Sequence, residues 1–173
     1  MFERAVKSPW SLVLQSAEQK KTMASSRESV GAVSVKTFDK DVQEDARAIS
    51  FTGSETAAVR LMAAFPSDLR SYVEKSGQLQ MQIKVDQAAD APLWLGMQCG
   101  DDCQGKFDIS EQLKGQSGWQ TLNIDLACFA DQGVNLSQVF SPWQISTSAD
   151  WRVSIAKLSI HTNRETSSAI TCQ

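Results

Sequence analysis

Apolar and polar residues alternate along many short stretches of this chain, and the clearest case is residues 79–85. Apolar side chains there occupy every second position, and glutamine and lysine fill the positions between them. The same period of two recurs in 93–99 and 122–128, and it is typical of strands with one buried face. Because only the turn 86–92 separates the first two, they are predicted to pair as antiparallel neighbours. The segments 93–99 and 122–128 are predicted to face each other at the centre of the fold.

Weaker alternation predicts the remaining strands, at 10–14, 33–38, 47–51, 58–63, 143–145 and 153–160. In 153–160 the apolar parity changes between Ile155 and Leu158, which predicts a β-bulge near Ala156 or Lys157. Helical spacing is confined to 67–73 and 131–139. The stretch 15–28 is polar and has no period, so it is predicted to be a long solvated loop.

Eight to ten short strands with turn signals between them indicate an all-β fold. It is predicted to be an antiparallel β-sandwich or jelly roll with one or two short helices. A length of 173 residues predicts a single domain, 1–173, with a core over about 9–161 and a polar tail at 162–173.

The distribution of charges and the lack of a long apolar run argue against two classes of partner. Seventeen basic residues stand against twenty acidic ones, and the basic residues are scattered, so no nucleic-acid-binding face is expected. No apolar run reaches the roughly 18 residues of a membrane span, so no membrane partner is expected. Residues 1–10 resemble neither a signal peptide nor a tag.

Catalytic motifs are also missing from the sequence. His161 is the only histidine, and no G-x-S-x-G elbow or phosphate-binding glycine motif is present. The adjacent acids Glu44–Asp45 and Asp101–Asp102 are more typical of solvated turns than of a glycosidase pair. The 173-residue chain is therefore expected to have no catalytic site of its own and no cofactor, and nothing in it supports a Ca²⁺ site.

The four cysteines suggest where the protein works. Cys99 and Cys103 lie in a Gly/Asp loop, and their spacing favours a disulfide over free thiols. The cysteines and His161 are poorly spaced for zinc, so no metal site is expected. A disulfide implies an oxidising compartment, the periplasm or the cell exterior. Cys128 is expected to be a buried thiol, with a Cys128–Cys172 bridge as the alternative.

Tryptophan is unusually frequent, with five residues against one tyrosine. Trp94 has the parity opposite to its buried neighbours and lies close to Gln98, so its ring could stack on a sugar. The alternative is that Trp94 covers a sheet or lies under a loop. Core positions are expected for Trp10, Trp143 and Trp151, and Trp119 is left open.

Several motifs together resemble a known family. They are CGDDCQGKFDIS, GWQTLNIDLACF, the G-x-N-L-x-x-V spacing of 133–139, Pro142-Trp143 with Ile145 and Thr147, and WRVSIAKLSI. With PWSLVL and VQEDARAISFTG they are similar to the ExoP-type, galactose-binding-like C-terminal domain of bacterial family 3 exo-β-glucosidases. The resemblance spans residues 9–160 and departs at Trp143, where the family pattern has Phe.

The resemblance implies a sandwich of the carbohydrate-binding-module type whose catalytic residues lie on other domains of the parent enzyme. The chain would be a non-catalytic accessory domain of a periplasmic or secreted family 3 glycosidase. It would pack on the catalytic domains and support binding of β-glucan or gluco-oligosaccharides. Candidate sugar contacts are Trp94, Gln98, Gln43, Glu44 and Gln15. Two alternatives remain, an autonomous carbohydrate-binding module and a purely structural or interaction domain.

Overall fold

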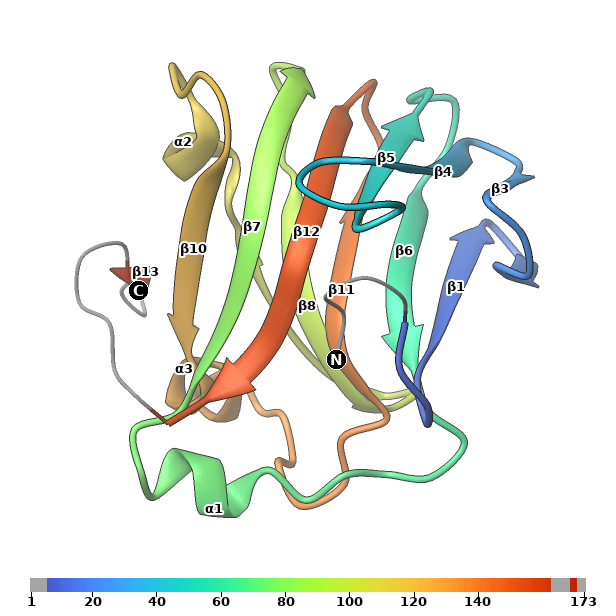
Figure 1. Ribbon diagram of the computed structural model, residues 1–173. Helices are drawn as coiled ribbons and strands as arrows, with labels where there is room; N and C mark the ends of the chain where they lie inside the picture. Colours follow the sequence, from blue (N-terminus) through green and yellow to red (C-terminus); the bar gives the residue numbers. More distant parts are fainter. Residues whose placement is uncertain (1–5, 163–168, 171–173) are drawn as a thin grey trace.

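Two stacked β-sheets form the body of the molecule in the computed structural model, which describes residues 6–162 and 169–170 (Figure 1). The six-stranded sheet has the order β2-β1-β6-β11-β8-β9. Its strands are β1 (Ser11–Ser16), β2 (Gln19–Thr22), β6 (Ala57–Met62), β8 (Trp94–Gly100), β9 (Cys103–Asp108) and β11 (Ser141–Thr147).

The seven-stranded sheet has the order β13-β10-β7-β12-β5-β4-β3. Its strands are β3 (Arg27–Val30), β4 (Val33–Phe38), β5 (Ala46–Phe51), β7 (Gln78–Gln87), β10 (Gln120–Asp125), β12 (Arg152–His161) and β13 (Ala169–Ile170). The pairing is antiparallel throughout these strands except between β10 and β13, which run parallel. The predicted antiparallel sandwich is confirmed.

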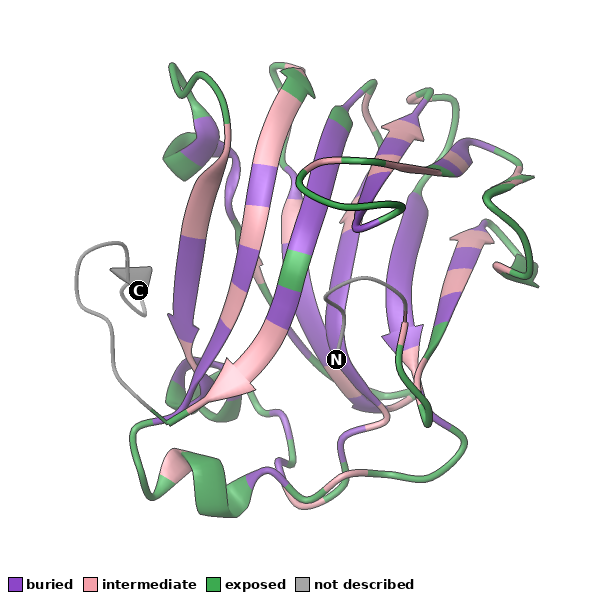
Figure 2. Cartoon of the chain, in the orientation of Figure 1, coloured by how far each residue is buried: buried purple, intermediate pink, exposed green. Residues whose placement is uncertain are grey.

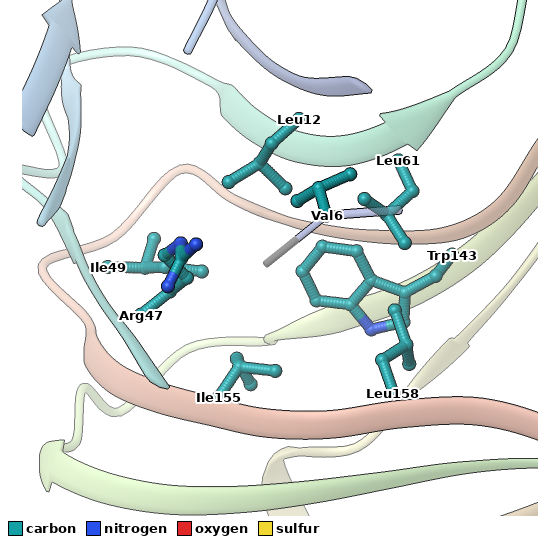
Figure 3. A pocket seen from close by; sticks show the side chains of 8 residues that line it. All are labelled: Val6, Leu12, Arg47, Ile49, Leu61, Trp143, Ile155 and Leu158. Carbon is teal, nitrogen blue, oxygen red and sulfur yellow. The ribbon is translucent and has the colours of Figure 1, made fainter. Parts of the chain in front are cut away.

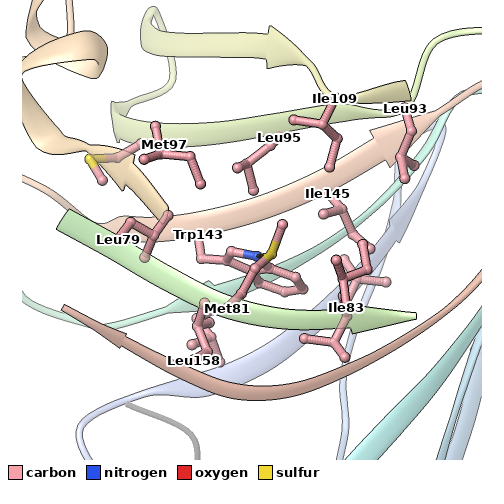
Figure 4. Close-up of a cluster of buried hydrophobic side chains, with 14 of the residues drawn as sticks. Leu79, Met81, Ile83, Leu93, Leu95, Met97, Ile109, Trp143, Ile145 and Leu158 are labelled. Atoms are coloured by element: carbon pink, nitrogen blue, oxygen red, sulfur yellow. Dashed lines mark hydrogen bonds between the residues drawn. The ribbon is translucent and has the colours of Figure 1, made fainter. Parts of the chain in front are cut away.

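The apolar side of every long strand faces the space between the sheets. Figure 4 shows this cluster, in which Met81 from one sheet meets Trp143 from the other. The indole Nε1 of Trp143 donates to Met81 Sδ at 3.3 Å, so the one polar atom of this large side chain has a partner inside the core. Trp143 and Trp151 are buried as expected, whereas Trp10 is only partly buried.

Three short helices close the ends of the sandwich, one more than expected. They are α1 (Arg70–Val73), α2 (Ser110–Leu113) and α3 (Leu126–Asp131). The expected helical piece at 131–139 is wrong, because α3 ends where that piece was to begin. The predicted strand 122–128 is also shorter, since β10 stops at Asp125. Leu126 and Cys128 continue the alternation of β10, but Leu126 and Phe129, three residues apart, are both buried on α3, which fits a helix and not a strand.

The expected pairing of 79–85 with 93–99 is wrong. β7 pairs with β10 and β12, whereas β8 pairs with β11 and β9 in the opposite sheet. The segment between them is a crossing from one sheet to the other, not a hairpin turn. Thr147 Oγ1 donates to Pro92 O at 2.8 Å and Trp151 Nε1 donates to Ala91 O at 3.0 Å, and these bonds hold the crossing in place.

The stretch 15–28 is not a loop. It contains the end of β1, all of β2 and the start of β3, and β1 and β2 form a hairpin that turns at 17–18. Figure 2 shows that this edge is largely exposed. When both faces of a strand are solvated, apolar and polar residues need not alternate, so the sequence of such a strand carries no period of two.

Smaller expectations have mixed outcomes. The predicted bulge is confirmed, because the β12–β7 register shifts between Ala156 and Ser159 and Lys157 has a φ of 47°. The Cys99–Cys103 disulfide is also confirmed. Cys128 is buried but disulfide-bonded, so the expectation of a free thiol is wrong. Cys172 and most of the predicted polar tail lie outside the described residues. No helix of the described chain is long and apolar enough to span a membrane.

Candidate functional site

Polar side chains from five strands converge on the outer face of the six-stranded sheet. They stand at the positions that alternate with core residues, so the pattern that fills the core also directs them outward. The central ones are Gln15 on β1, Arg60 on β6, Gln144 on β11, Gln98 on β8 and Lys106 on β9. They line a hollow of about 310 Å³, called the amide groove below.

Arg60 is the centre of the amide groove. Its side chain is 8% exposed, and its guanidinium donates from Nη1 to Gln98 Oε1 at 2.9 Å and from Nη2 to Gln15 Oε1. No carboxylate in the described chain forms an ion pair with it. Burial lowers the pKa of the guanidinium, and the charge of Asp101 acts in the opposite direction. Arg60 therefore fixes two glutamine amides and leaves a cation at the floor of the groove.

Two atoms at this floor have no hydrogen-bond partner within the described structure. They are Arg60 Nε, a donor, and Gln144 Oε1, an acceptor, and both residues are 8% exposed. Arg60 and Gln144 are direct cross-strand partners of β6 and β11, so their side chains leave the sheet side by side. A buried polar atom without a partner costs about 1–3 kcal/mol. Two neighbouring residues that line the groove therefore each keep one buried polar atom without a partner, a donor on Arg60 and an acceptor on Gln144.

One end of the amide groove is bounded by Trp94 and Lys106. Trp94 is partly buried on β8, and Lys106 Nζ lies 4.6 Å from the centroid of its ring. Gly96 lies between these residues and Gln144, and a Cβ there would lie 3.6 Å from Lys106 Cβ and 3.9 Å from Gln144 Nε2. The absence of a side chain at Gly96 leaves the groove open between its central and its aromatic parts.

The Cys99–Cys103 disulfide shapes another edge of the amide groove. It closes the turn between β8 and β9, next to Gln98 and Gln104, whose amides are 3.5 Å apart. Asn135 N donates to Cys99 Sγ at 3.1 Å, which ties this turn to the loop after α3. The covalent bridge thus holds the two strands that carry glutamines into the groove.

The structure brings together three of the five predicted contacts. Trp94, Gln98 and Gln15 share the outer face of the six-stranded sheet, but Gln43 and Glu44 lie in the β4–β5 loop of the other sheet. Glu44 accepts from Thr37 Oγ1 at 3.1 Å and lines a separate cleft with Trp10 and other residues. The sequence did not single out Arg60, Gln144 or Lys106. The signal for Arg60 was a lone charge inside the apolar run AAVRLM.

A hollow in the core is too small to bind a sugar. The one in Figure 3 lies between the sheets among apolar side chains, has about 10 Å³ and holds at most one water. Its polar member, Arg47, donates from Nη1 to Ala46 O and Glu44 O. Among the described residues no cluster of three or more potential metal ligands is present.

The fold of this chain is similar to that of several solved structures. The chain superposes on an exo-1,3/1,4-β-glucanase from a Pseudoalteromonas species with a TM-score of 0.82 and 22% identity, covering 99% of this chain but only 21% of that one. The separately solved extra C-terminal domain of that enzyme is covered to 97%, with the same score and identity.

Carbohydrate-binding modules are more distant matches. A family 30 module of a Clostridium thermocellum cellulase has a TM-score of 0.63 and 18% identity, with 87% of this chain and 92% of that chain covered. The family 11 module from the same organism, solved with a β-1,3-1,4-mixed-linked tetrasaccharide, has a TM-score of 0.54 and 11% identity, with 91% of each chain covered. No curated protein sequence matches the chain.

The family itself is shown by sequence. The expected resemblance to the ExoP-type C-terminal domain is confirmed, because the family model of that domain matches residues 8–160. The chain therefore belongs to the Exop_C family of galactose-binding domain-like proteins.

Proposed function

We propose that this chain is a carbohydrate-binding accessory domain, without catalytic activity of its own, that binds β-glucan or gluco-oligosaccharides in the amide groove. The observation that carries the proposal is the pair of unpartnered atoms at its floor, Arg60 Nε and Gln144 Oε1. A hydroxyl group both donates and accepts, so the hydroxyl groups of a sugar in the groove can supply partners of both kinds. A carboxylate would suit Arg60 but would be repelled by the amide oxygen.

The rest of the amide groove suits a neutral saccharide. Four glutamines line it, Gln15, Gln98, Gln104 and Gln144, and amides both donate and accept, as a ring of hydroxyl groups requires. Arg60 holds the oxygens of Gln15 and Gln98, and their NH₂ groups donate to Ala17 O and Gln104 Oε1. Each NH₂ group has two hydrogens, so one N–H of each glutamine is left to donate to a ligand. Trp94 adds an apolar ring at one end of the same face, which suits the C–H face of a pyranose.

The parent protein is proposed to be a periplasmic or secreted family 3 β-glucosidase or exo-β-glucanase. Support comes from the fold match that covers 99% of this chain but 21% of the Pseudoalteromonas exo-glucanase. The catalytic domains would then be partners on which this domain packs. The disulfides at Cys99–Cys103 and Cys128 suit an oxidising compartment.

Affinity electrophoresis in gels containing mixed-linkage β-glucan tests the proposal. The wild-type chain is expected to be retarded, and Gln144→Leu, which removes the amide while keeping much of its volume, should bind about fivefold more weakly or worse. Gln80→Leu is the matched control, since Gln80 donates to Asn123 Oδ1 at 2.9 Å on the outer face of the other sheet. No retardation of the wild type, or equal loss in both variants, would contradict the proposal.

The two alternatives give different results in the full-length parent. An autonomous module would bind glucan as tightly alone as in the parent, and its removal would leave kcat/KM on short oligosaccharides unchanged. A purely structural domain would show no retardation, and Gln144→Leu would leave kcat/KM on every substrate unchanged.

A further inference from the structure

Lys106 separates Trp94 from the amide groove. It lines the groove itself and places its Nζ 4.6 Å from the centroid of the Trp94 ring. Ser146, the cross-strand partner of Trp94 on β11, also lines the groove, but Trp94 does not. The groove thus reaches the immediate neighbours of the indole and ends at the lysine.

The position of Lys106 follows from the strand register. Lys106 on β9 pairs with Gly96 on β8, and Trp94 is the next residue of β8 on the same face. Because Gly96 has no side chain, nothing on the sheet holds Lys106 away from the tryptophan. The register therefore directs a cation towards the ring that is suited to stack on a sugar.

The contact that holds Lys106 is weak. Lys106 is exposed, and within the described chain it forms no ion pair, so the indole is the group that holds its ammonium. A cation over an aromatic ring at an exposed site contributes about 0.5–1 kcal/mol. Rotation of a flexible four-carbon side chain is enough to move the ammonium away.

We propose that Lys106 covers the face of Trp94 in the free protein and that a pyranose unit of the ligand displaces it, which extends the amide groove by one sugar position. This inference rests on the proposed function. Lys106 is then a residue that weakens binding, because the ligand must replace the cation–π contact before it can stack. It also sets specificity, since only a chain long enough to reach beyond Gln144 and Ser146 meets the indole.

A double-mutant cycle tests the proposal by calorimetry with a mixed-linkage β-1,3-1,4-glucan tetrasaccharide. Lys106→Met keeps the length of the side chain and removes its charge, and it should bind about two- to fivefold more tightly than wild type. In a Trp94→Ala background the same substitution should give no gain. Lys84→Met, on the outer face of the other sheet, is the control for removal of a positive charge.

Each outcome is informative. Weaker binding by Lys106→Met would mean that the ammonium contacts the sugar directly and would overturn the proposal. A gain that persists without Trp94 would overturn it as well. Absence of binding by wild type and by all variants would refute the proposed function together with this inference, whereas normal wild-type binding without a gain refutes the inference alone.

A spectroscopic signature tests the same contact directly. In the free chain, the ring current of Trp94 should shift the Lys106 side-chain NMR signals upfield, and Trp94→Ala should remove that shift. Saturation with the tetrasaccharide should also remove it in the wild type. A shift that survives saturation would show that the ammonium stays on the ring and would overturn the proposal.

Discussion

The outer faces of the two sheets both carry polar side chains, but they differ in how the charges near their centres are paired. On the seven-stranded sheet Asp86 forms an ion pair with Lys84 at 2.7 Å and accepts from Ser154 Oγ, and Lys157 lies 3.7 Å from Asp41. On the six-stranded sheet Arg60 and Lys106 have no ion pair within the described structure. Internally paired charges are typical of a surface that stabilises the fold, and unpaired groups over a hollow are typical of a surface that binds.

The two faces also use tryptophan differently. Trp119 stacks on Phe38, with ring centroids 6.3 Å apart, and Lys40 of the β4–β5 loop lies over it. That loop crosses the front of the seven-stranded sheet (Figure 1). Trp119 therefore lies under a loop that covers the sheet. Trp94 lies beside the amide groove, and a lysine side chain lies over its ring.

The contrast between the two outer faces depends most on Arg60. Arg60→Met should lower glucan affinity about tenfold to a hundredfold, because a charged hydrogen-bond donor is worth about 1.5–3 kcal/mol. Lys84→Met should leave the affinity unchanged. Calorimetry measures both, and thermal unfolding checks that each variant folds. Equal affinities of Arg60→Met and wild type would show that the amide groove is not the binding surface.

Removing the Cys99–Cys103 bridge tests whether the groove depends on a fixed edge. Replacing both cysteines by serine should lower the free energy of unfolding by about 2 kcal/mol, the chain-entropy value for so short a loop, and lower Tm by about 4–8 °C. Because Gln98 and Gln104 flank the bridge, glucan affinity should fall as well. Urea unfolding and calorimetry provide the two readings. A stability loss with unchanged affinity would separate the bridge from the groove.

Substituting the two surface tryptophans sharpens the contrast between the faces. Trp119→Ala should cost about 1–2 kcal/mol of stability, less than a fully buried tryptophan, and leave glucan affinity unchanged. Trp94→Ala should weaken binding about twofold to tenfold, the usual range for one aromatic contact. Loss of affinity in Trp119→Ala would place ligand on the seven-stranded sheet instead.

Acid should change the stability contributed by the seven-stranded side of the molecule but not glucan binding on the six-stranded side. This is the smallest of the four predicted effects. Asp45 organises the β4–β5 loop by accepting hydrogen bonds from the backbone N–H groups of Lys40, Asp41 and Val42. Burial raises the pKa of its carboxyl group, but these hydrogen bonds outweigh burial, and the pKa lies below the usual 3.8. Its stabilising contribution is complete above pH 3.8 and is lost as the pH falls below that value through the lowered pKa of the folded state.

The matching measurement is urea unfolding of wild type and Asp45→Asn as the pH falls from neutral to below 3.8. The variant should be less stable at neutral pH and should lose less stability in acid. Glu18 lines the amide groove, but within the described residues no carboxylate forms a hydrogen bond or ion pair with Arg60 or Gln144. Carboxylates ordinarily titrate below this range, so glucan affinity should stay flat between about pH 5 and pH 8. A steep change in that range would show that an acid takes part in binding.

The alternation of residues predicted much of this fold and part of its site. It separated inward from outward positions correctly in β7 and β8, and it placed Trp94 and Gln98 on the outward parity. It failed at α3, where Leu126 and Cys128 continue the alternation of β10, and at β2, where every residue is exposed and no buried face creates a pattern. Arg60 is the one polar residue of β6, and Gln144 is one of several on β11. Both were missed because nothing in the local sequence marks residues of two distant strands as neighbours.

The sequence by itself determined which side chains face the core and which face solvent, because the period of two depends only on the pleat of each strand. Tertiary structure alone decided which strands are neighbours. β7 and β8 follow each other in the chain yet lie in opposite sheets, while β1, β6, β11 and β8 come from distant segments and lie in one. Strand order is set by contacts between residues far apart in sequence, so the amide groove exists only once those strands have been brought together.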